Sequence, residues 1–275
     1  MATTRDDASQ ATKEAAKQAV DSKPVEWLAR FGLVSRGVIW LIIGLLALQI
    51  AVGGGGEADR KGALRAIASK PLGHTMLVAL LIGFCGYAIW RLLEAVAGHR
   101  DEEGAKRWVK RAASAGRGVL YGSFAYSVIS FLSSGGGGKG DNTKPATVRV
   151  MSHTGGRWLV GAVGLAVLIG GLVIAVRGVR AKFLEKLKPL SSAMRTTASL
   201  LGRVGLVGRG LVIALVGWFL LHAALIFKAS SAKGLDQSLK TLAGQPYGEL
   251  LLGAAAIGLV SYGLWSFIEA RYRKV

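Results

Sequence analysis

The sequence predicts an all-α integral membrane protein with six transmembrane helices, arranged as three parallel two-helix repeats about a pseudo-threefold axis. Charge distribution is the first reason. Of the 275 residues 51% are hydrophobic, yet the 35 lysines and arginines lie between long charge-free runs instead of along every helix, which is typical of membrane proteins. The second reason is that segments of the chain repeat.

Six apolar runs are long enough, at about 1.5 Å per residue, to cross most of a hydrocarbon core of about 30 Å. They are Gly37–Val52, Leu72–Trp90, Gly118–Ser134, Trp158–Val176, Gly210–Phe227 and Tyr247–Ile268. The third is the least apolar because it contains several serines. Its tyrosines and phenylalanines fit a helix packed inside the bundle instead of facing lipid.

Orientation follows from the cations in the connections. The side of the membrane that holds both termini carries 24 of the 35 lysines and arginines, and the other side carries 11. Because cytoplasmic loops are enriched in lysine and arginine, we expect both termini to lie in the cytoplasm.

The organisation that we predict is a polar cytoplasmic tail followed by three repeats. The tail covers residues 1–24 and lacks the apolar stretch of a signal peptide, and the repeats cover 25–98, 99–182 and 183–275. A single cysteine, Cys85, excludes an intrachain disulfide and a cysteine-based metal cluster. We expect no cofactor.

The repeats are clearest between the first and third copies. The residues RFGLVSRG at 30–37 match RVGLVGRG at 203–210, and ALRAIASKPLG at 63–73 matches SLKTLAGQPYG at 238–248. Further on, Tyr87, Trp90, Glu94 and Ala95 correspond to Tyr262, Trp265, Glu269 and Ala270. The middle copy keeps the Arg117-Gly118 opening but has lost the proline and the closing Glu-Ala. Each unit holds two spans, so the copies enter the membrane in the same orientation.

The connection between the two spans of a unit is amphipathic. In the first copy Ala63, Leu64 and Ile67 alternate with charged residues, and in the third copy Leu235, Leu239 and Leu242 do so. We expect a short helix on the outer surface that ends before Pro71 or Pro246.

These motifs resemble a bacterial family of paired-helix membrane repeats catalogued as a domain of unknown function, number 1206. The features are the R-x-G-L-V-x-R-G opening, the amphipathic segment ending in Pro-x-Gly, and the Tyr-x-x-Trp…Glu-Ala ending, and the resemblance covers roughly residues 27–271. It implies a bacterial plasma-membrane protein and supports the triplication. It carries over no activity and no catalytic residues.

Charged residues at the cytoplasmic ends of the spans are candidates for structural ion pairs. Within each antiparallel hairpin, Arg36 and Glu94 fall at the same depth, as do Arg209 and Glu269. We expect these pairs to fasten the hairpins.

An alternative use of the arginines is binding of an anion or an anionic lipid headgroup. The middle unit favours it slightly, because Arg117 and Arg177 have no acid between them.

A polar layer is a further hypothesis. Aligning the Arg-Gly openings brings Gln49, Ser130 and His222 to one depth, where they could surround the axis. His222 could sense pH or shuttle a proton. The plainer interpretation is interhelical hydrogen bonding.

Three function classes remain. An accessory or scaffold subunit of a membrane complex ranks first, because the cytoplasmic face offers cations to anionic lipids or to a membrane-protein partner and no catalytic motif is present. A small channel or transporter with an axial polar path ranks second, and an enzyme ranks last. The net charge of +19 does not predict nucleic-acid binding, because its cations flank apolar runs and no nucleic-acid-binding motif accompanies them.

Overall fold

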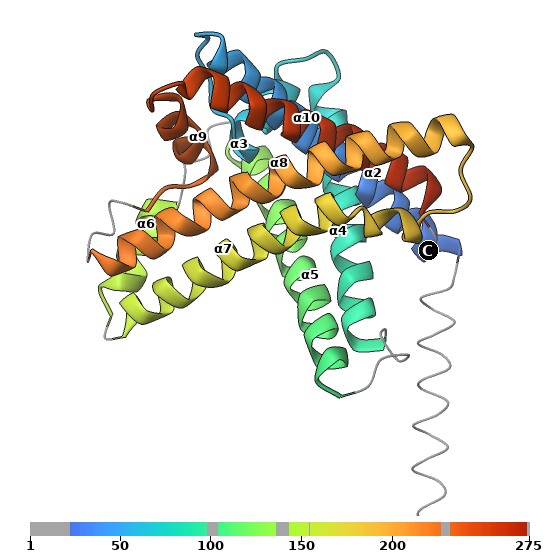
Figure 1. The fold of residues 1–275 in the computed structure, drawn as a ribbon, viewed down its shortest axis with the longest axis horizontal. Coiled ribbons are helices and arrows are strands. Elements are labelled where there is room, and N and C mark those ends of the chain that lie inside the picture. Colours follow the sequence, from blue (N-terminus) through green and yellow to red (C-terminus); the bar gives the residue numbers. More distant parts are fainter. Residues whose placement is uncertain (1–22, 98–103, 136–142, 154, 227–231, 274–275) are drawn as a thin grey trace, which may run out of the picture.

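The computed structural model describes residues 23–97, 104–135, 143–153, 155–226 and 232–273 (Figure 1). Almost all of the predicted tail, residues 1–22, lies outside the described residues. The long helices of the described part are α2 (Lys23–Ala51), α4 (Gly73–Ala97), α5 (Gly104–Ser133), α7 (Gly156–Arg180), α8 (Ser192–Leu225) and α10 (Gly248–Tyr272). The short ones are α3 (Arg60–Ala68), α6 (Thr143–Met151), α9 (Leu235–Ala243) and a 3-10 helix, η1 (Lys182–Lys186).

Five of these helices are long and apolar enough to cross a membrane: α2, α4, α7, α8 and α10. The predicted third span lies in α5, which does not reach the apolarity of the others. The first half of α5 carries five cations, which are Lys106, Arg107, Lys110, Arg111 and Arg117, and its second half contains serines. The described structure therefore confirms a helical protein with several helices that could span a membrane, and α5 is not one of these five.

The predicted surface helices of the first and third repeats are formed. Helix α3 buries Leu64 and Ile67, and α9 buries Leu239. Asp236 in α9 is buried as well, where its carboxylate accepts a hydrogen bond of 2.8 Å from the Ala58 amide. This bond ties the third repeat to the connection of the first.

A left-handed residue precedes the second helix of every repeat. In the two Pro-x-Gly turns this residue is Leu72, with φ +63°, or Tyr247, with φ +59°, and in the middle copy it is Gly155, with φ +80°. The middle copy lost the proline but gained the residue type that adopts this backbone most easily. The turn is thus a shared property of all three copies.

Glycine contacts fasten each repeat to the one before it. Gly37 of α2 lies against Gly263 and Phe267 of α10, and Gly118 of α5 lies against Ala88 and Leu92 of α4. In the same way, Gly210 of α8 lies against Gly171 and Ala175 of α7. These contacts fall at equivalent repeat positions, so three interfaces of one type are formed, the first of them closing repeat 1 onto repeat 3. Small residues allow such close backbone approach in membranes.

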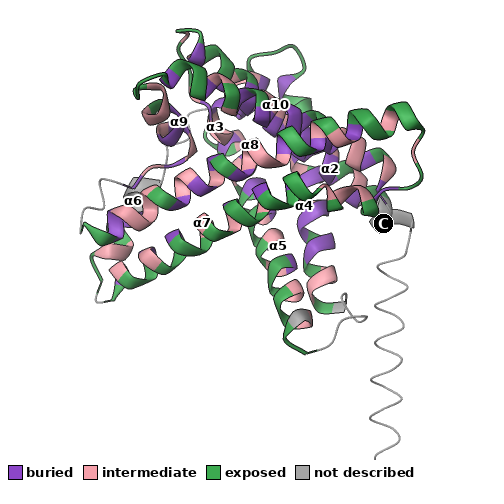
Figure 2. Ribbon diagram, viewed as in Figure 1, coloured by how far each residue is buried: buried purple, intermediate pink, exposed green. Residues whose placement is uncertain are grey.

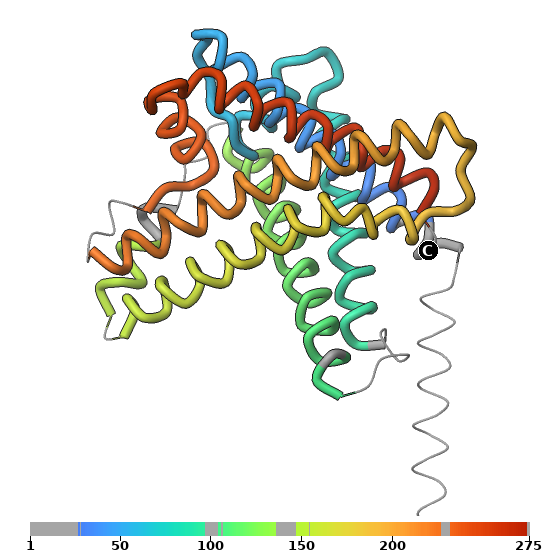
Figure 3. Tube along the Cα trace, in the orientation of Figure 1, coloured from blue at the N-terminus to red at the C-terminus, as the bar shows by residue number. Residues whose placement is uncertain are grey.

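Among the described residues, the two long helices of a repeat pack side by side in only two of the three copies. Gly32 packs on Tyr87 between α2 and α4, and Gly205 packs on Tyr262 between α8 and α10. In the middle copy the described backbones of α5 and α7 do not pack against each other, although α7 crosses in front of α5 in the view of Figure 3. The order of packing is α5, α4, α2, α10, α8, α7.

Burial follows from this order. The buried core lies around α2, α4 and α10, whereas α7 is largely exposed along its length (Figure 2). Of the most apolar stretch of each helix, 56% is buried in α2 and only 17% in α7. Repeat 2 is therefore split, with one helix at each end of the row.

Two adjacent glycines test the α7–α8 contact. A Cβ at Gly171 would lie 2.4 Å from the Ala214 backbone nitrogen, whereas a Cβ at Gly170 would meet nothing within 4 Å. We expect Gly171→Ala to destabilise the protein by roughly 1–3 kcal/mol through overpacking. Gly170→Ala should be neutral or stabilising by up to about 1 kcal/mol, since alanine is the better helix former. Thermal unfolding in detergent micelles measures both, and equal effects would contradict this helix arrangement.

Candidate functional site

Five helices bring arginines and tyrosines together in the interior. Tyr87 of α4, Tyr121 of α5 and Tyr262 of α10 are buried, and Arg36 of α2 lies within electrostatic reach of all three. Tyr121 also interacts electrostatically with Arg209 of α8. The Tyr87 and Tyr121 ring centroids are 4.4 Å apart. We call these five residues the arginine–tyrosine cluster.

Arg36 makes the best-formed ion pair of the cluster. Its Nη2 donates to Oε2 of Glu269 at 2.6 Å, its Nε donates to Ser266 Oγ at 3.2 Å, and its guanidinium lies over the Tyr262 ring. Arg273 also pairs with Glu269. Arg36 and Glu269 are both largely buried, so removing either one would leave the other charge buried without its partner, which is costly.

The expected pairing of Arg36 with Glu94 and of Arg209 with Glu269 is wrong. Glu94 instead pairs with Arg91 on its own helix and accepts a hydrogen bond of 3.1 Å from Ser114 Oγ of α5. Equal depth alone led to the expectation, but α2 presents Arg36 to α10 and not to α4. The acid comes from the neighbouring repeat.

Arg209 has no acid at the corresponding place. The residue of α7 that is equivalent to Glu94 and Glu269 is Arg177, and it is exposed. Arg209 instead donates from Nη1 to the Tyr262 hydroxyl at 2.6 Å and lies over the rings of Tyr262 and Trp40. The substitution at one repeat position explains this change of partner.

Two buried donors near Arg209 stay unsatisfied within the described structure. They are Arg209 Nε and Trp40 Nε1, and the Trp40 side chain packs edge-on against Tyr262. Buried polar groups without a partner are uncommon and costly. The α8 side of the cluster therefore lacks hydrogen-bond acceptors for these two donors.

Arg117, predicted as an anion contact, lies on α5 close to Arg91. Among the described residues it forms no hydrogen bond or ion pair. Burial and the nearby Arg91 lower the pKa of Arg117, which Tyr87 and Glu94 only partly oppose. Arg177, the other predicted contact, lies on α7, which does not touch α5. The structure therefore does not bring the two together.

The predicted polar layer is not formed. Gln49 and Ser130 are exposed, and among the described residues the backbones of α2, α5 and α8 do not lie side by side. His222 is half-buried and stacks on Trp218 of its own helix at a centroid distance of 6.1 Å. Equal spacing from the Arg-Gly opening therefore does not bring the three residues together.

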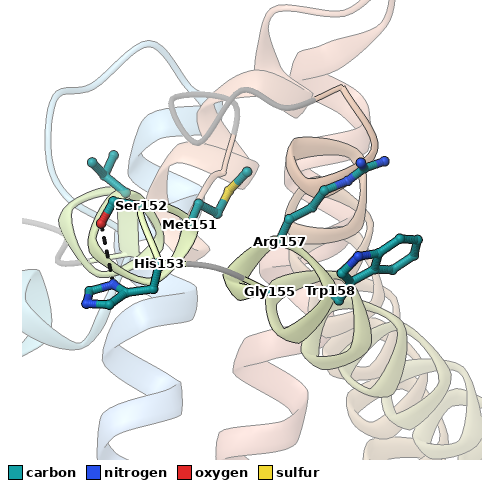
Figure 4. A pocket seen from close by; sticks show the side chains of 7 residues that line it. Met151, Ser152, His153, Gly155, Arg157 and Trp158 are labelled. Carbon is teal, nitrogen blue, oxygen red and sulfur yellow. Dashed lines mark hydrogen bonds between the residues drawn. The ribbon is translucent and has the colours of Figure 1, made fainter.

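An open pocket lies between the end of α6 and the start of α7 (Figure 4). Figure 4 shows Ser152 and His153 on one side and Arg157 and Trp158 on the other. His153 Nδ1 lies 2.8 Å from the Arg149 carbonyl, and Arg157 Nε donates to the Ala224 carbonyl at 3.1 Å. These polar groups are occupied by backbone partners. Among the described residues, no group of three His, Cys, Asp or Glu side chains is placed to hold a metal ion.

Three segments of the chain, residues 31–98, 112–181 and 204–273, match the family described as Domain of Unknown Function (DUF1206). The chain belongs to this family. The three matches confirm the resemblance and the triplication, and with the apolar helices they indicate a multi-pass membrane protein. The uncharacterized protein YxxB of Bacillus subtilis (strain 168) is 29% identical over 260 residues, which cover 92% of this chain and 93% of that protein. No solved structure matches the chain significantly.

Sequence reasoning missed Arg91, Arg273 and the role of the tyrosines in this member of the family. Tyr87 and Tyr262 stood in the repeat motif, and their hydroxyls accept hydrogen bonds from Arg91 and Arg209 respectively. The repetition of a tyrosine in the same motif as the repeated arginines was the sequence signal from which these contacts could have been predicted. Arg273 lay beyond the last matched motif and gave none.

The ion pair can be tested by a double-mutant cycle. We expect Glu269→Gln to destabilise the protein by roughly 3–5 kcal/mol, because it leaves Arg36 and Arg273 buried without an acid. Arg36→Gln combined with Glu269→Gln should show a coupling of at least about 1 kcal/mol in unfolding measurements. Arg36→Gln combined with Glu94→Gln is the control and should be additive within about 0.5 kcal/mol. Strong coupling between Arg36 and Glu94 without coupling between Arg36 and Glu269 would support the pairing within the hairpin instead.

Proposed function

We propose that the protein is an accessory or scaffold subunit of a bacterial plasma-membrane complex. In this proposal α5 is a sixth span, both termini lie in the cytoplasm, and the partner binds at the separated helices of repeat 2. The observation that carries the proposal is that the described backbones of α5 and α7 do not pack against each other. In repeats 1 and 3 the two long helices pack against each other. In repeat 2 the equivalent faces of α5 and α7 do not meet, so each of them is left without the helix that covers it in the other repeats.

Repeat positions define these faces. Ser35 packs on Gly83 in the first copy and Gly208 on Gly258 in the third, and the equivalents in the second copy are Gly116 and Ala166. Gly116 has open space where its Cβ would stand. The α5 face is therefore smooth and small, as helix interfaces in membranes are.

The α7 face has a gap at a large repeat position. Tyr87 and Tyr262 fill it in repeats 1 and 3, and Gly170 stands there in repeat 2 with nothing near it. A partner helix with a bulky side chain at this level would supply the missing volume. We infer a transmembrane helix as the partner.

The alternative, a channel or transporter, draws no support from the residues first considered for it. Gln49 and Ser130 are exposed on helices that do not touch, and the place where five helices converge is filled by tyrosine rings. A filled axis favours an architectural role.

Membrane topology tests the sixth span. In a Cys85→Ser background, Ser9→Cys and Lys188→Cys should be protected from an impermeant thiol reagent in intact cells, and Lys70→Cys should react. Lys188 is the deciding position, because a chain in which α5 does not cross would place it outside. The same reagent after permeabilisation is the control for intrinsic reactivity.

A photo-crosslinking residue in place of Gly170 tests whether a partner helix binds to this face of α7. On a helix of about 100° per residue, Leu172 faces the side opposite to Gly170 and is the matched control. We expect a discrete adduct in native membranes from position 170 and none from 172.

Closure of repeat 2 on itself is the competing outcome. Gly116→Cys with Ala166→Cys, again without Cys85, would then form an intrachain disulfide efficiently in native membranes. Efficient closure, or equal adducts from positions 170 and 172, would contradict the scaffold proposal.

A further inference from the structure

A group of cations gathers where α4, α5, η1 and the end of α10 approach one another. Arg91 and Arg273 both lie over the Trp90 ring, with guanidinium carbons 4.2 Å and 5.1 Å from its centroid. Both are buried, and each forms an ion pair with one glutamate, Glu94 or Glu269. Glu94 and Glu269 are therefore already in use.

Lys186 is fixed beside this group by the backbone. The segment after η1 is bound to the end of α10, because the Lys188 amide donates to the Tyr272 carbonyl at 2.7 Å and Leu187 bridges Arg273. Lys186 is exposed, and it forms no hydrogen bond or ion pair with the described residues. Desolvation and the nearby Arg273 and Arg117 lower the pKa of Lys186. A cation is thus held where positive charge already accumulates.

Arg117 approaches the same place from α5. Ser114, one turn earlier, donates to Glu94, which places this face of α5 against the end of α4. In the first repeat the equivalent arginine, Arg36, is neutralised by a glutamate of the neighbouring repeat. For Arg117 that glutamate is Glu94, and Arg91 and Ser114 occupy it. Arg117 is left half-buried with its donors unused among the described residues.

We propose that Arg117 and Lys186 together bind a phosphate group, carried by an anionic phospholipid headgroup or by free inorganic phosphate. The fork of a guanidinium and the ammonium of a lysine are both established phosphate ligands. Arg91 and Arg273 add to the field without giving up their glutamates. The site is open through Lys186 and lies where α4 and α10 end, the level at which basic pockets between helices bind lipid headgroups.

Binding is measured in two arms on the full chain. In the first, protein in phosphatidylcholine nanodiscs is titrated with inorganic phosphate at constant ionic strength, and the shift in unfolding temperature is recorded. In the second, nanodiscs contain equal phosphatidylcholine and phosphatidylglycerol, and the phosphatidylglycerol retained after mild detergent extraction is counted by mass spectrometry.

Arg117→Gln and Lys186→Gln should each weaken binding about tenfold, which corresponds to about 1.4 kcal/mol. Lys182→Gln removes the same charge from another exposed position of η1 and should change binding less than about twofold, as expected for an exposed charge outside the site. Without anion, the two site variants should unfold at the same temperature as the unmodified protein or higher, because they remove an unneutralised cation. This result separates loss of binding from loss of folding.

A response in the lipid arm alone identifies a headgroup, a response in the phosphate arm alone identifies a soluble anion, and both support the shared chemistry. Absence of binding in both arms overturns the proposal. So does an equal loss with Lys182→Gln, which would mean diffuse attraction to a basic surface, or undiminished binding by the Arg117→Gln and Lys186→Gln variants.

Discussion

The arrangement depends on one type of backbone contact, in which a glycine of the first helix of each repeat meets the second helix of the preceding repeat. Gly37, Gly118 and Gly210 hold this position, and each follows an arginine in the sequence. Because the glycine brings the two backbones together, the arginine before it stands beside the neighbouring repeat. Van der Waals packing of this kind is the main attraction available between helices in a bilayer, where the hydrophobic effect does not bring apolar helices together.

The position of the arginines explains the electrostatics of the interior. Each one is directed to an acid position of the preceding repeat, and that position holds Glu269, Glu94 and Arg177 for Arg36, Arg117 and Arg209 respectively. Only the first of these combinations gives the simple pair. Arg209 turns to aromatic rings, an arrangement that a desolvated guanidinium tolerates better than an ammonium does. One geometric rule thus gives three different chemical environments.

The sequence was sufficient for the elements that depend on local pattern. Helix positions, the Pro-x-Gly turns and the amphipathic α3 and α9 follow from periodicity, charge and the two prolines. The sequence did not predict which neighbouring helix each side chain faces. Equal spacing from the Arg-Gly opening predicts the depth of a residue but not its direction around the helix axis. The sequence predicts one depth for Arg36 and Glu94 and another for Gln49, Ser130 and His222, yet neither set is brought together. The direction is set by glycine contacts between segments far apart in sequence, which a single sequence does not reveal.

Divergence of the middle copy is concentrated at positions that matter for closure. Repeat 2 has Gly170 where the others have a buried tyrosine and Arg177 where the others have a glutamate. The first change removes the side chain that Gly32 and Gly205 pack against, and the second removes an acid that would neutralise Arg209. A repeat that merely drifted would lose packing and charge at unrelated sites, whereas these two losses lie on one helix two turns apart. Of the long helices, α7 contacts only α8 among the described residues, and Arg209 has no acid at the equivalent position of α7. Of these two consequences, the first concerns the α7 face that we propose for a partner helix, and the second concerns the surroundings of Arg209.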